Sequence, residues 1–531
     1  MRRSVPASLV VTAPLVVTAA LVAAACSTQS SSSADQIVLA EGQELGGYNP
    51  IAGYGELGVS PIYEGLYRPQ ASDDRRVPDL VAALAQSAPS RIGARQWRIV
   101  LRPDVRFSDG SAFDSADVVA TYRAVRDPAV ASEISTHFAP IVDVAPDGPR
   151  AVTVRLSTDA DPTPYLLLGI VPSERVEARP ASDWSLNTAP VGTGPYRLES
   201  LEPDQAVLVA RDDRRGGSPG LKRIVYSYVP DDNTRAQRVA AGEIDGANLP
   251  PRLADSLGRQ PDVSVVAARS ADWRNVSLPA GNAFTADPQA RLAMNQGVDR
   301  NAIVADVLAG KGAPASTPVA DVYGAAFEPA AQYRLDRASA ATTLDRAGWL
   351  PGPDGVRTRS GVRAEFTLLY NAQDTLRRDL AVAFAAAMKP LGVAVTPRGT
   401  SWDDIDSRLG TDAVILGGGE TPYSIDSQVY DTLHTRVPDS SPYANPGDFT
   451  APGLDRLLDD ARAGAPGPAD DERYRQIQRI YAAQPSSVFL AFLHHTYATR
   501  DSGWRHAAPI LEPHSHGVAW GPWWDLESWR R

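Results

Sequence analysis

Two hydrophobic patterns interleave along the chain from residue 36 onward. Short apolar runs with a period of about two predict β-strands, and longer segments with apolar positions every three or four residues predict helices. The predicted strands are 36–40, 97–102, 152–156, 224–229, 366–370 and 413–416. The predicted helices are 59–67, 115–122, 232–241, two within 287–308, 337–347, 376–388, 453–463 and 470–482, and Ser115 is the expected N-cap of the second. This interleaving of strands and helices favours an α/β fold.

The first 34 residues follow another pattern. Arg2 and Arg3 precede a long apolar run that ends in three alanines before Cys26, and a serine-rich stretch follows. A basic start, an apolar run and small residues in this order are typical of a secretory signal. A cysteine directly after them is typical of a bacterial lipoprotein, whose thiol is diacylated. We therefore expect a signal peptide at 1–25, lipidation of Cys26 and a tether at 26–34; an uncleaved membrane anchor is the alternative.

Composition narrows the functional classes. Cys26 is the one cysteine of the 531-residue sequence, which excludes a disulfide scaffold and a multi-cysteine metal site. The net charge of −11 argues against nucleic-acid binding, which depends on a basic surface. Hydrophobic residues make up 43% of the chain, which is enough to build buried cores.

Residues 216–220 match the G-x-S-x-G pattern of serine hydrolases. A nucleophilic serine in this pattern needs an apolar strand before it and a helix after it. Here charged residues 212–215 precede the pattern and a predicted strand follows it, so we interpret it as a surface loop. The sequence contains no P-loop, no dinucleotide-binding glycine pattern and no H-E-x-x-H motif. We expect a binding protein without catalysis; a secreted hydrolase is the alternative from another class.

Five of the seven histidines follow residue 490, and two of them have a spacing suited to metal binding. On a strand, His514 and His516 would face the same side and could ligate one ion. The sequence specifies no third ligand, so surface or structural histidines are the favoured interpretation. We expect neither a resident metal nor a cofactor.

Seven segments in order along the chain resemble the family 5 extracellular solute-binding proteins, the dipeptide, oligopeptide and nickel receptors of ABC importers. They are IYEGLYR at 62–68, VPDLVAAL at 77–84, the segment 97–122, VGTGPYRL at 191–198, AAGEIDGA at 240–247, the segment 289–312 and ATTLDRAGW at 341–349. The sequence departs from the family pattern at 87–90, where a tryptophan is usual. The strong excess of arginine over lysine is typical of high-GC genomes and favours an actinobacterial source.

The resemblance implies a two-lobed, periplasmic-binding-protein-like clamp of the class II type. Lobe one would comprise residues 35–268, with an extra domain at about 66–180, and lobe two residues 269–485. Residues 486–531 would return to lobe one, which places the hinge near Ala268 and Gln484. The implied protein is a monomer, anchored by lipid at the extracytoplasmic face of the cell membrane, that captures di- to oligopeptides in the interlobe cleft. It would deliver them to the permease subunits of an ABC transporter.

The resemblance also implies ligand contacts. In relatives a carboxylate in the loop after the strand at 413–416 pairs with the peptide amine. Glu420 lies closest to this position and Asp426 is the nearest aspartate; alternatively, Glu420 is solvated and Asp426 caps a helix that starts near Ser427. Arg377 or Arg378 could bind the peptide carboxylate. Haem or a chelated metal such as nickel is the alternative ligand. The aromatic residues expected to line the cleft, or else to fill the core, are Tyr48, Tyr54, Tyr196, Trp273, Trp402 and Tyr423.

Overall fold

The computed structural model describes residues 35–531 except 438–439, 465–466, 502, 506 and 515–516. The predicted signal peptide, Cys26, the tether and His516 lie outside the described residues. Within the described part, no helix has both the length and the apolar character needed to cross a bilayer.

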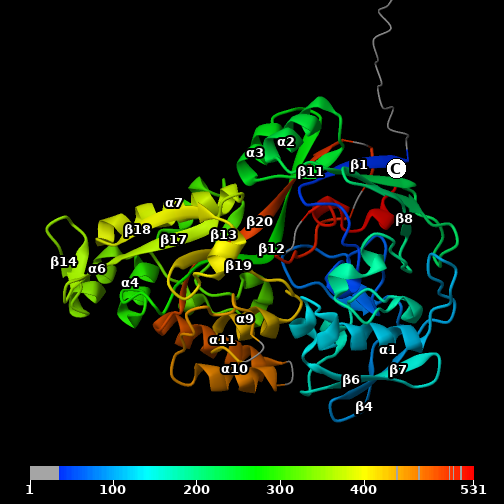
Figure 1. The fold of residues 1–531 in the computed structure, drawn as a ribbon, viewed down its shortest axis with the longest axis horizontal. Helices are drawn as coiled ribbons and strands as arrows, with labels where there is room; N and C mark the ends of the chain where they lie inside the picture. The colour runs from blue at the N-terminus through cyan, green and yellow to red at the C-terminus, as the bar shows by residue number, and fades with distance from the viewer. Residues whose placement is uncertain (1–34, 438–439, 465–466, 502, 506, 515–516) are drawn as a thin grey trace, which may run out of the picture. The chain divides into compact units, whose positions relative to one another are not determined.

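One mixed sheet of eleven described strands runs through the protein (Figure 1). In pairing order its strands are β18 (Ala394–Thr400), β17 (Glu365–Asn371), β19 (Ala413–Gly418), β12 (Val263–Ser277), β20 (Ser487–Arg500), β11 (Gly246–Asn248), β1 (Gln36–Glu41), β10 (Arg223–Tyr228), β9 (Gln205–Ala210) and β8 (Tyr196–Glu202), with β13 (Gly312–Pro314) paired to β20. Strands from the first and second halves of the sequence therefore meet at the central pair β12 and β20.

The long strands β12 and β20 connect the two sides of this sheet. They pair antiparallel, and their register breaks between Arg269 and Trp273. At the break Ser270 forms a parallel bridge with Glu512 of the C-terminal tail. The predicted crossing at Ala268 lies within this strand pair, and Gln484 immediately follows the last helix before β20. The lobe boundaries themselves stay a prediction.

The second half of the chain packs its helices around two hydrophobic cores. One core, which includes Trp349, contains residues of α4 (Pro288–Gly297), α5 (Arg300–Asp306), α6 (Arg337–Arg346) and α7 (Thr375–Met388). The other contains residues of α8 (Trp402–Asp406), α9 (Ile425–Leu433), α10 (Leu454–Arg462) and α11 (Pro468–Ala483). A small sheet of β14 (Leu350–Pro351), β15 (Arg357–Arg359) and β16 (Val362–Arg363) follows α6.

The first half contains a second small sheet, drawn in blue and cyan in Figure 1. Its strands, in pairing order, are β4 (Ser90–Gly93), β5 (Gln96–Val100), β7 (Ala151–Leu156) and β6 (Ile141–Pro146), and α1 (Ser115–Ala124) packs against it. All of these elements fall within the range expected for an extra domain. A hairpin of β2 (Tyr67–Pro69) and β3 (Leu80–Ala82) precedes them, and α2 (Asp232–Ala241) and α3 (Pro251–Leu257) cover β11 and β20.

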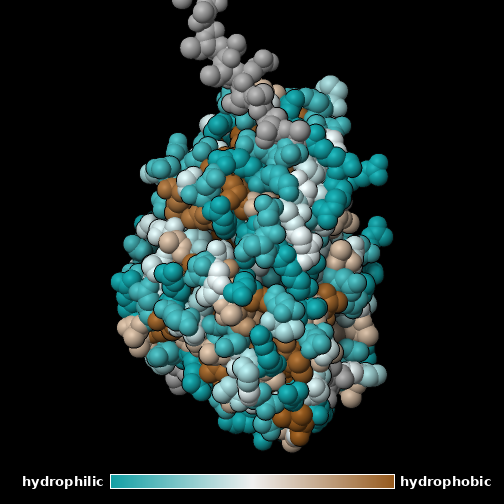
Figure 2. Space-filling model, turned by 90° about the vertical axis from the view of Figure 1, so that its right-hand side faces the viewer, coloured by the Kyte–Doolittle hydropathy of each residue, from teal (hydrophilic) through white to brown (hydrophobic). Residues whose placement is uncertain are grey.

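The C-terminal tail returns to the core of the first half. Its buried tryptophans lie in the same hydrophobic cluster as residues of β1, β8 and β10; they are Trp520, Trp523, Trp524 and Trp529. Burial of such large apolar surfaces anchors the tail strongly. On the face in Figure 2, hydrophobic residues form separated patches within a mostly hydrophilic surface.

Two local predictions are wrong. Residues 59–67 form no helix, because this segment packs in extended conformation and turns against residues 166–170, with Ile170 N donating to Glu64 O at 3.0 Å. Its apolar character reflects burial on both sides. The N-cap of α1 is Asp114 and not Ser115: the Asp114 carboxylate accepts from Ala116 N, and Asp117 accepts from Asp114 N.

Candidate functional site

A cavity of about 520 Å³ lies between residues of the two halves of the chain. This volume falls within the roughly 300–1,000 Å³ range of small-molecule sites. Its walls come from the end of β1, from 230–251, from the start of α7, from β20 and from the tail. The polar residues that line it include Glu41, Asp232, Arg235, Arg274, Lys311, Asp374, Arg377, His494, His495 and His514.

Two arginines, Arg274 and Arg377, give this cavity a cationic wall. Arg377 lies in the first turn of α7 with its side chain 12% exposed, bonded to Asp374 at 2.9 Å and placed over the ring of Trp402. Burial and the nearby charge of Arg274 lower the pKa of Arg377. In the described part of the chain, the Nε atoms of both arginines are buried without a hydrogen-bond partner. The wall can therefore donate further hydrogen bonds to an anionic group.

Arg274 also belongs to a buried charged cluster, which we define as Asp272, Arg274, His495, Glu512 and His514. The fully buried Asp272 carboxylate pairs with Arg274 and accepts from His495 Nε2 at 3.0 Å and His514 Nδ1 at 2.8 Å. Burial alone would raise the pKa of Asp272. The charges of Arg274 and His514 and the hydrogen bonds from both histidines outweigh it and hold the pKa well below its usual range.

His495 is the cationic centre of the buried charged cluster. Burial opposes its protonation, but hydrogen bonds to Asp272 and Glu512 and the charges of both carboxylates raise the pKa of His495 to about 9. The imidazolium donates from Nε2 to Asp272 and from Nδ1 to Glu512, the latter at 2.7 Å. Glu512 also accepts from Tyr497 Oη and Gly521 N, each at 2.7 Å. The cluster thus ties β12, β20 and the tail together at the register break.

The two arginines predicted to bind the peptide carboxylate differ in their position relative to the cavity. Arg377 lines the cavity, whereas Arg378 is exposed, pairs with Asp379 and does not line it. A role for either in ligand binding stays a prediction.

The two predicted carboxylates lie away from the lining of this cavity. Glu420 is exposed and accepts from Gly419 N at 3.0 Å. Asp426 is mostly buried in the first turn of α9 and pairs with Arg462 at 2.9 Å. The alternative role of Asp426 as a cap near Ser427 is wrong, because α9 begins at Ile425 after Ser424.

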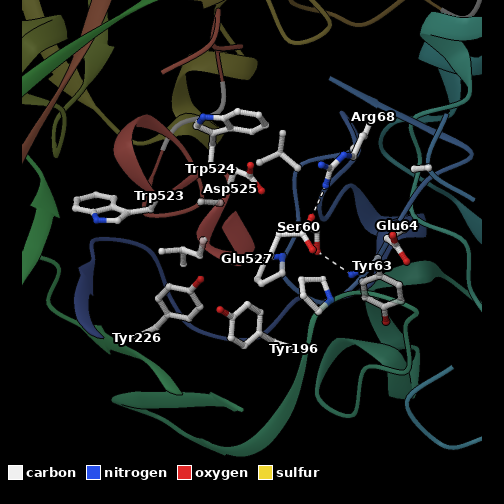
Figure 3. Close-up of a pocket in the computed structure, with 17 residues that line it drawn as sticks. Ser60, Tyr63, Glu64, Arg68, Tyr196, Tyr226, Trp523, Trp524, Asp525 and Glu527 are labelled. Carbon is white, nitrogen blue, oxygen red and sulfur yellow. Dashed lines mark hydrogen bonds and ion pairs between the residues drawn. The ribbon is translucent and has the colours of Figure 1, made fainter. Parts of the chain in front are cut away.

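Of the six aromatic candidates, Trp402 lines the 520 Å³ cavity. Trp273 packs in the core, with its ring centre 5.1 Å from that of Phe489. Tyr48 and Tyr54 contact each other edge to face, and the Tyr423 hydroxyl donates to Leu511 O at 3.1 Å. Tyr196 lines a separate cavity of about 40 Å³ in the first half, where Figure 3 shows its hydroxyl beside Tyr226. These five positions are better explained by packing, which is the alternative that the sequence left open.

Of the alternative metal pair, His514 and His516, the structure describes one residue. His514 belongs to no strand, and Asp272 engages its Nδ1 atom, while His516 lies outside the described residues. Among the described residues, no three His, Cys, Asp or Glu side chains are grouped so that they could hold a metal ion.

The G-x-S-x-G segment lies in a loop between β9 and β10, as expected. Ser218 Oγ accepts a hydrogen bond from Lys222 Nζ at 2.7 Å.

Comparison with known proteins gives a consistent picture. Residues 79–438 match the model for bacterial extracellular solute-binding proteins, family 5. The chain is similar to Protein XP55 of Streptomyces lividans, with 33% identity over 89% of this chain and 86% of the relative, which suggests the expected actinobacterial source.

The fold resembles that of NikZ from Campylobacter jejuni in complex with Ni(L-His), with a TM-score of 0.80 and 22% identity, over 94% of this chain and 100% of the other. It also resembles AppA from Bacillus subtilis in complex with a nonapeptide, with a TM-score of 0.73 and 20% identity, over 93% and 98% of the two chains. The likeness to these structures shows the two-lobed clamp fold.

Proposed function

Because the chain belongs to the bacterial extracellular solute-binding proteins of family 5, we propose that it captures di- to oligopeptides in the 520 Å³ cavity and delivers them to an ABC permease. The family consists of binding proteins of ABC importers that take peptides or nickel chelates. Its members bind and hand over a solute, and we expect no bond of the ligand to be broken here.

The distribution of charge across the cavity carries this proposal. Arg274 and Arg377 offer buried guanidinium groups from the second half of the chain, and Glu41 lines the cavity from the first half. Burial raises the pKa of Glu41, and its carboxylate accepts from Gly42 N and Val518 N. A peptide with a free carboxylate and a free amine would complement both walls. Its capture would hold the two halves together, as expected for a clamp that closes on its ligand.

The carboxylate that binds the peptide amine can be identified with paired variants. The resemblance assigns the amine to Glu420 or Asp426, and the cavity adds Glu41 as a buried candidate. We expect Glu41→Gln to weaken binding of free-amine peptides at least tenfold, because a charged hydrogen bond contributes roughly 1.5–3 kcal/mol. Calorimetry with free and N-acetylated forms of one peptide measures this loss.

The N-acetylated peptide provides the control, because Glu41→Gln should leave its affinity nearly unchanged. Glu420→Gln and Asp426→Asn are tested in the same way. A selective loss confined to either of these variants would place the amine at the loop 417–426 and contradict the assignment to Glu41.

A metal chelate is the second candidate ligand, with haem as a related alternative. His494 lines the cavity, and burial together with the charge of Arg269 lowers its pKa to about 4. A neutral imidazole can ligate a metal ion that arrives with its own chelator. The likeness to NikZ in complex with Ni(L-His) supports keeping this candidate.

We further propose that Cys26 carries the lipid that holds the protein at the extracytoplasmic face of the membrane. Two acyl chains on one residue give stable anchoring, whereas a single chain gives marginal binding. We expect Cys26→Ser to abolish processing before residue 26 or to release the protein, as measured by membrane fractionation and N-terminal mass analysis. A variant that remains membrane-bound and is cleaved at the same bond would contradict lipidation.

A further inference from the structure

A second polar cavity of about 360 Å³ lies in the first half of the chain. The loop 214–219 forms one wall, and residues near β3 and the end of the tail form the others. None of its described lining residues also lines the 520 Å³ cavity. Gly216 and Gly217 adopt positive φ angles of 92° and 81°, which glycine tolerates, and they shape the loop at the rim. The G-x-S-x-G segment, which the transport function does not use, thus belongs to this second cavity.

The lining of this cavity carries an excess of positive charge. Five arginines and three carboxylates are among the described residues that line it: Arg68, Arg102, Arg214, Arg215, Arg530, Glu64, Asp525 and Glu527. The surplus of two positive charges contrasts with the net charge of −11 of the whole sequence.

Two of the three carboxylates, Glu527 and Glu64, already pair with arginines of this lining. Glu527 pairs with Arg214 at 2.8 Å and with Arg68, a contact drawn as a dashed line in Figure 3. Glu64 lies farther from its cations, 3.7 Å from Arg214 and 4.0 Å from Arg215, and burial raises its pKa. Protonation of Glu64 would increase the positive excess. The lining therefore does not neutralise its own guanidinium groups.

Arg102 and Arg215 are only weakly compensated cations of this lining, since the carboxylate paired with Arg215 is Glu64 at 4.0 Å. The side chain of Arg215 is 40% exposed. Its partial burial and the charge of Arg102 both lower the pKa of Arg215. Arg102 Nε donates to the carbonyl of Ala83 at 2.7 Å, a neutral acceptor. The Nε atom of Arg214 is buried without a hydrogen-bond partner among the described residues. An anion placed here would relieve the repulsion between Arg102 and Arg215 and would accept hydrogen bonds from guanidinium groups of the lining.

We propose that the 360 Å³ cavity is a second ligand site, which binds a small oxyanion with two or more negative charges between Arg102, Arg215 and the loop 214–219. A phosphate or a polycarboxylate has this chemistry. The site is separate from the peptide cavity and does not depend on the proposed transport function.

Calorimetry of the full chain with pyrophosphate and, separately, with citrate tests this proposal and distinguishes the two kinds of oxyanion. We expect one of them to bind with 1:1 stoichiometry at low ionic strength, and more weakly in 0.5 M salt because screening shortens to roughly 3–5 Å. Arg215→Gln should lower the affinity at least tenfold. The matched control is Arg91→Gln, which removes an exposed arginine of β4 that pairs with Asp159, and it should leave the affinity unchanged.

Three results would overturn the proposal. One is the absence of binding by both anions at millimolar concentration. Another is an equal loss of affinity in Arg215→Gln and Arg91→Gln, which would show only a general effect of charge. The third is loss of binding in Arg377→Gln with full binding in Arg215→Gln, which would place the anion in the 520 Å³ cavity.

Discussion

Arg377→Gln is expected to lower the affinity for peptides with a free carboxylate by at least about a hundredfold. Arg377 is largely buried at the cavity wall, lies over the ring of Trp402 and has an unpaired Nε atom. Loss of one partner from a buried ion pair typically costs about 3–5 kcal/mol, because the remaining charge stays desolvated. Calorimetry with one peptide as the free acid and as the C-terminal amide measures the effect, and only the free acid should lose most of its affinity.

Arg378→Gln is a closely matched control. Arg378 is the next residue, carries the same charge and pairs on the surface with Asp379. We expect it to change the affinity less than twofold, since exposed ion pairs contribute little. Equal losses for the acid and the amide in Arg377→Gln would show that Arg377 supports the structure of the site without binding the carboxylate.

Asp272→Asn is expected to lower the free energy of unfolding by about 3–5 kcal/mol. The substitution removes the carboxylate that pairs with buried Arg274 and His495, which leaves Arg274 without this counter-charge and His495 with Glu512 alone. Because the buried charged cluster ties β12 and β20 to the tail, the cost falls on the whole described fold. Denaturant unfolding measures the loss, and Asp379→Asn on the surface is the control.

The pH dependence of stability tests the same cluster. The pKa of His495 is raised from 6.5 to about 9, so its contribution is complete below pH 6.5 and is lost as the pH rises through 9. The loss amounts to roughly 3 kcal/mol at 1.4 kcal/mol per pKa unit. Asp272→Asn should show a smaller decline over this window, because one of the two carboxylates that raise the pKa is gone. An equally steep decline in both proteins would contradict the assigned role of His495.

Regular elements with strong local signals could be predicted from the sequence. The predicted helix at 232–241 has the bounds of α2, and its end at Gly242 follows from the positive φ of that glycine. The segment 59–67 could not be predicted, because its apolar residues are buried by loops far along the chain. The periodicity of apolar positions predicts a helix or strand only when one face of the segment is buried. Here the segment is covered on more than one side, so its apolar positions do not indicate its conformation.

The candidate site could be predicted only where the resemblance or a local residue pattern supplied a position. The resemblance led to Arg377, and the proximity of aromatic residues to glycines led to Trp402; the two meet at the cavity wall. The buried charged cluster was missed, because Asp272 and His495 are separated by 223 residues and only the pairing of β12 with β20 brings them together. The one available signal was the pair Asp272 and Arg274, but it stands among other polar residues of β12 such as Arg269 and Asn275, so no apolar pattern marked it as buried.

Native mass spectrometry of the protein with a mixture of di- to pentapeptides tests the central claim most directly. We predict that the wild-type protein retains one intact peptide per chain and that Arg377→Gln retains far less. Every peptide should leave the complex with its mass unchanged, because binding breaks no bond. Exclusive retention of haem or a metal chelate, failure to retain any peptide, or the appearance of peptide fragments would contradict the proposal that this protein captures peptides for transport.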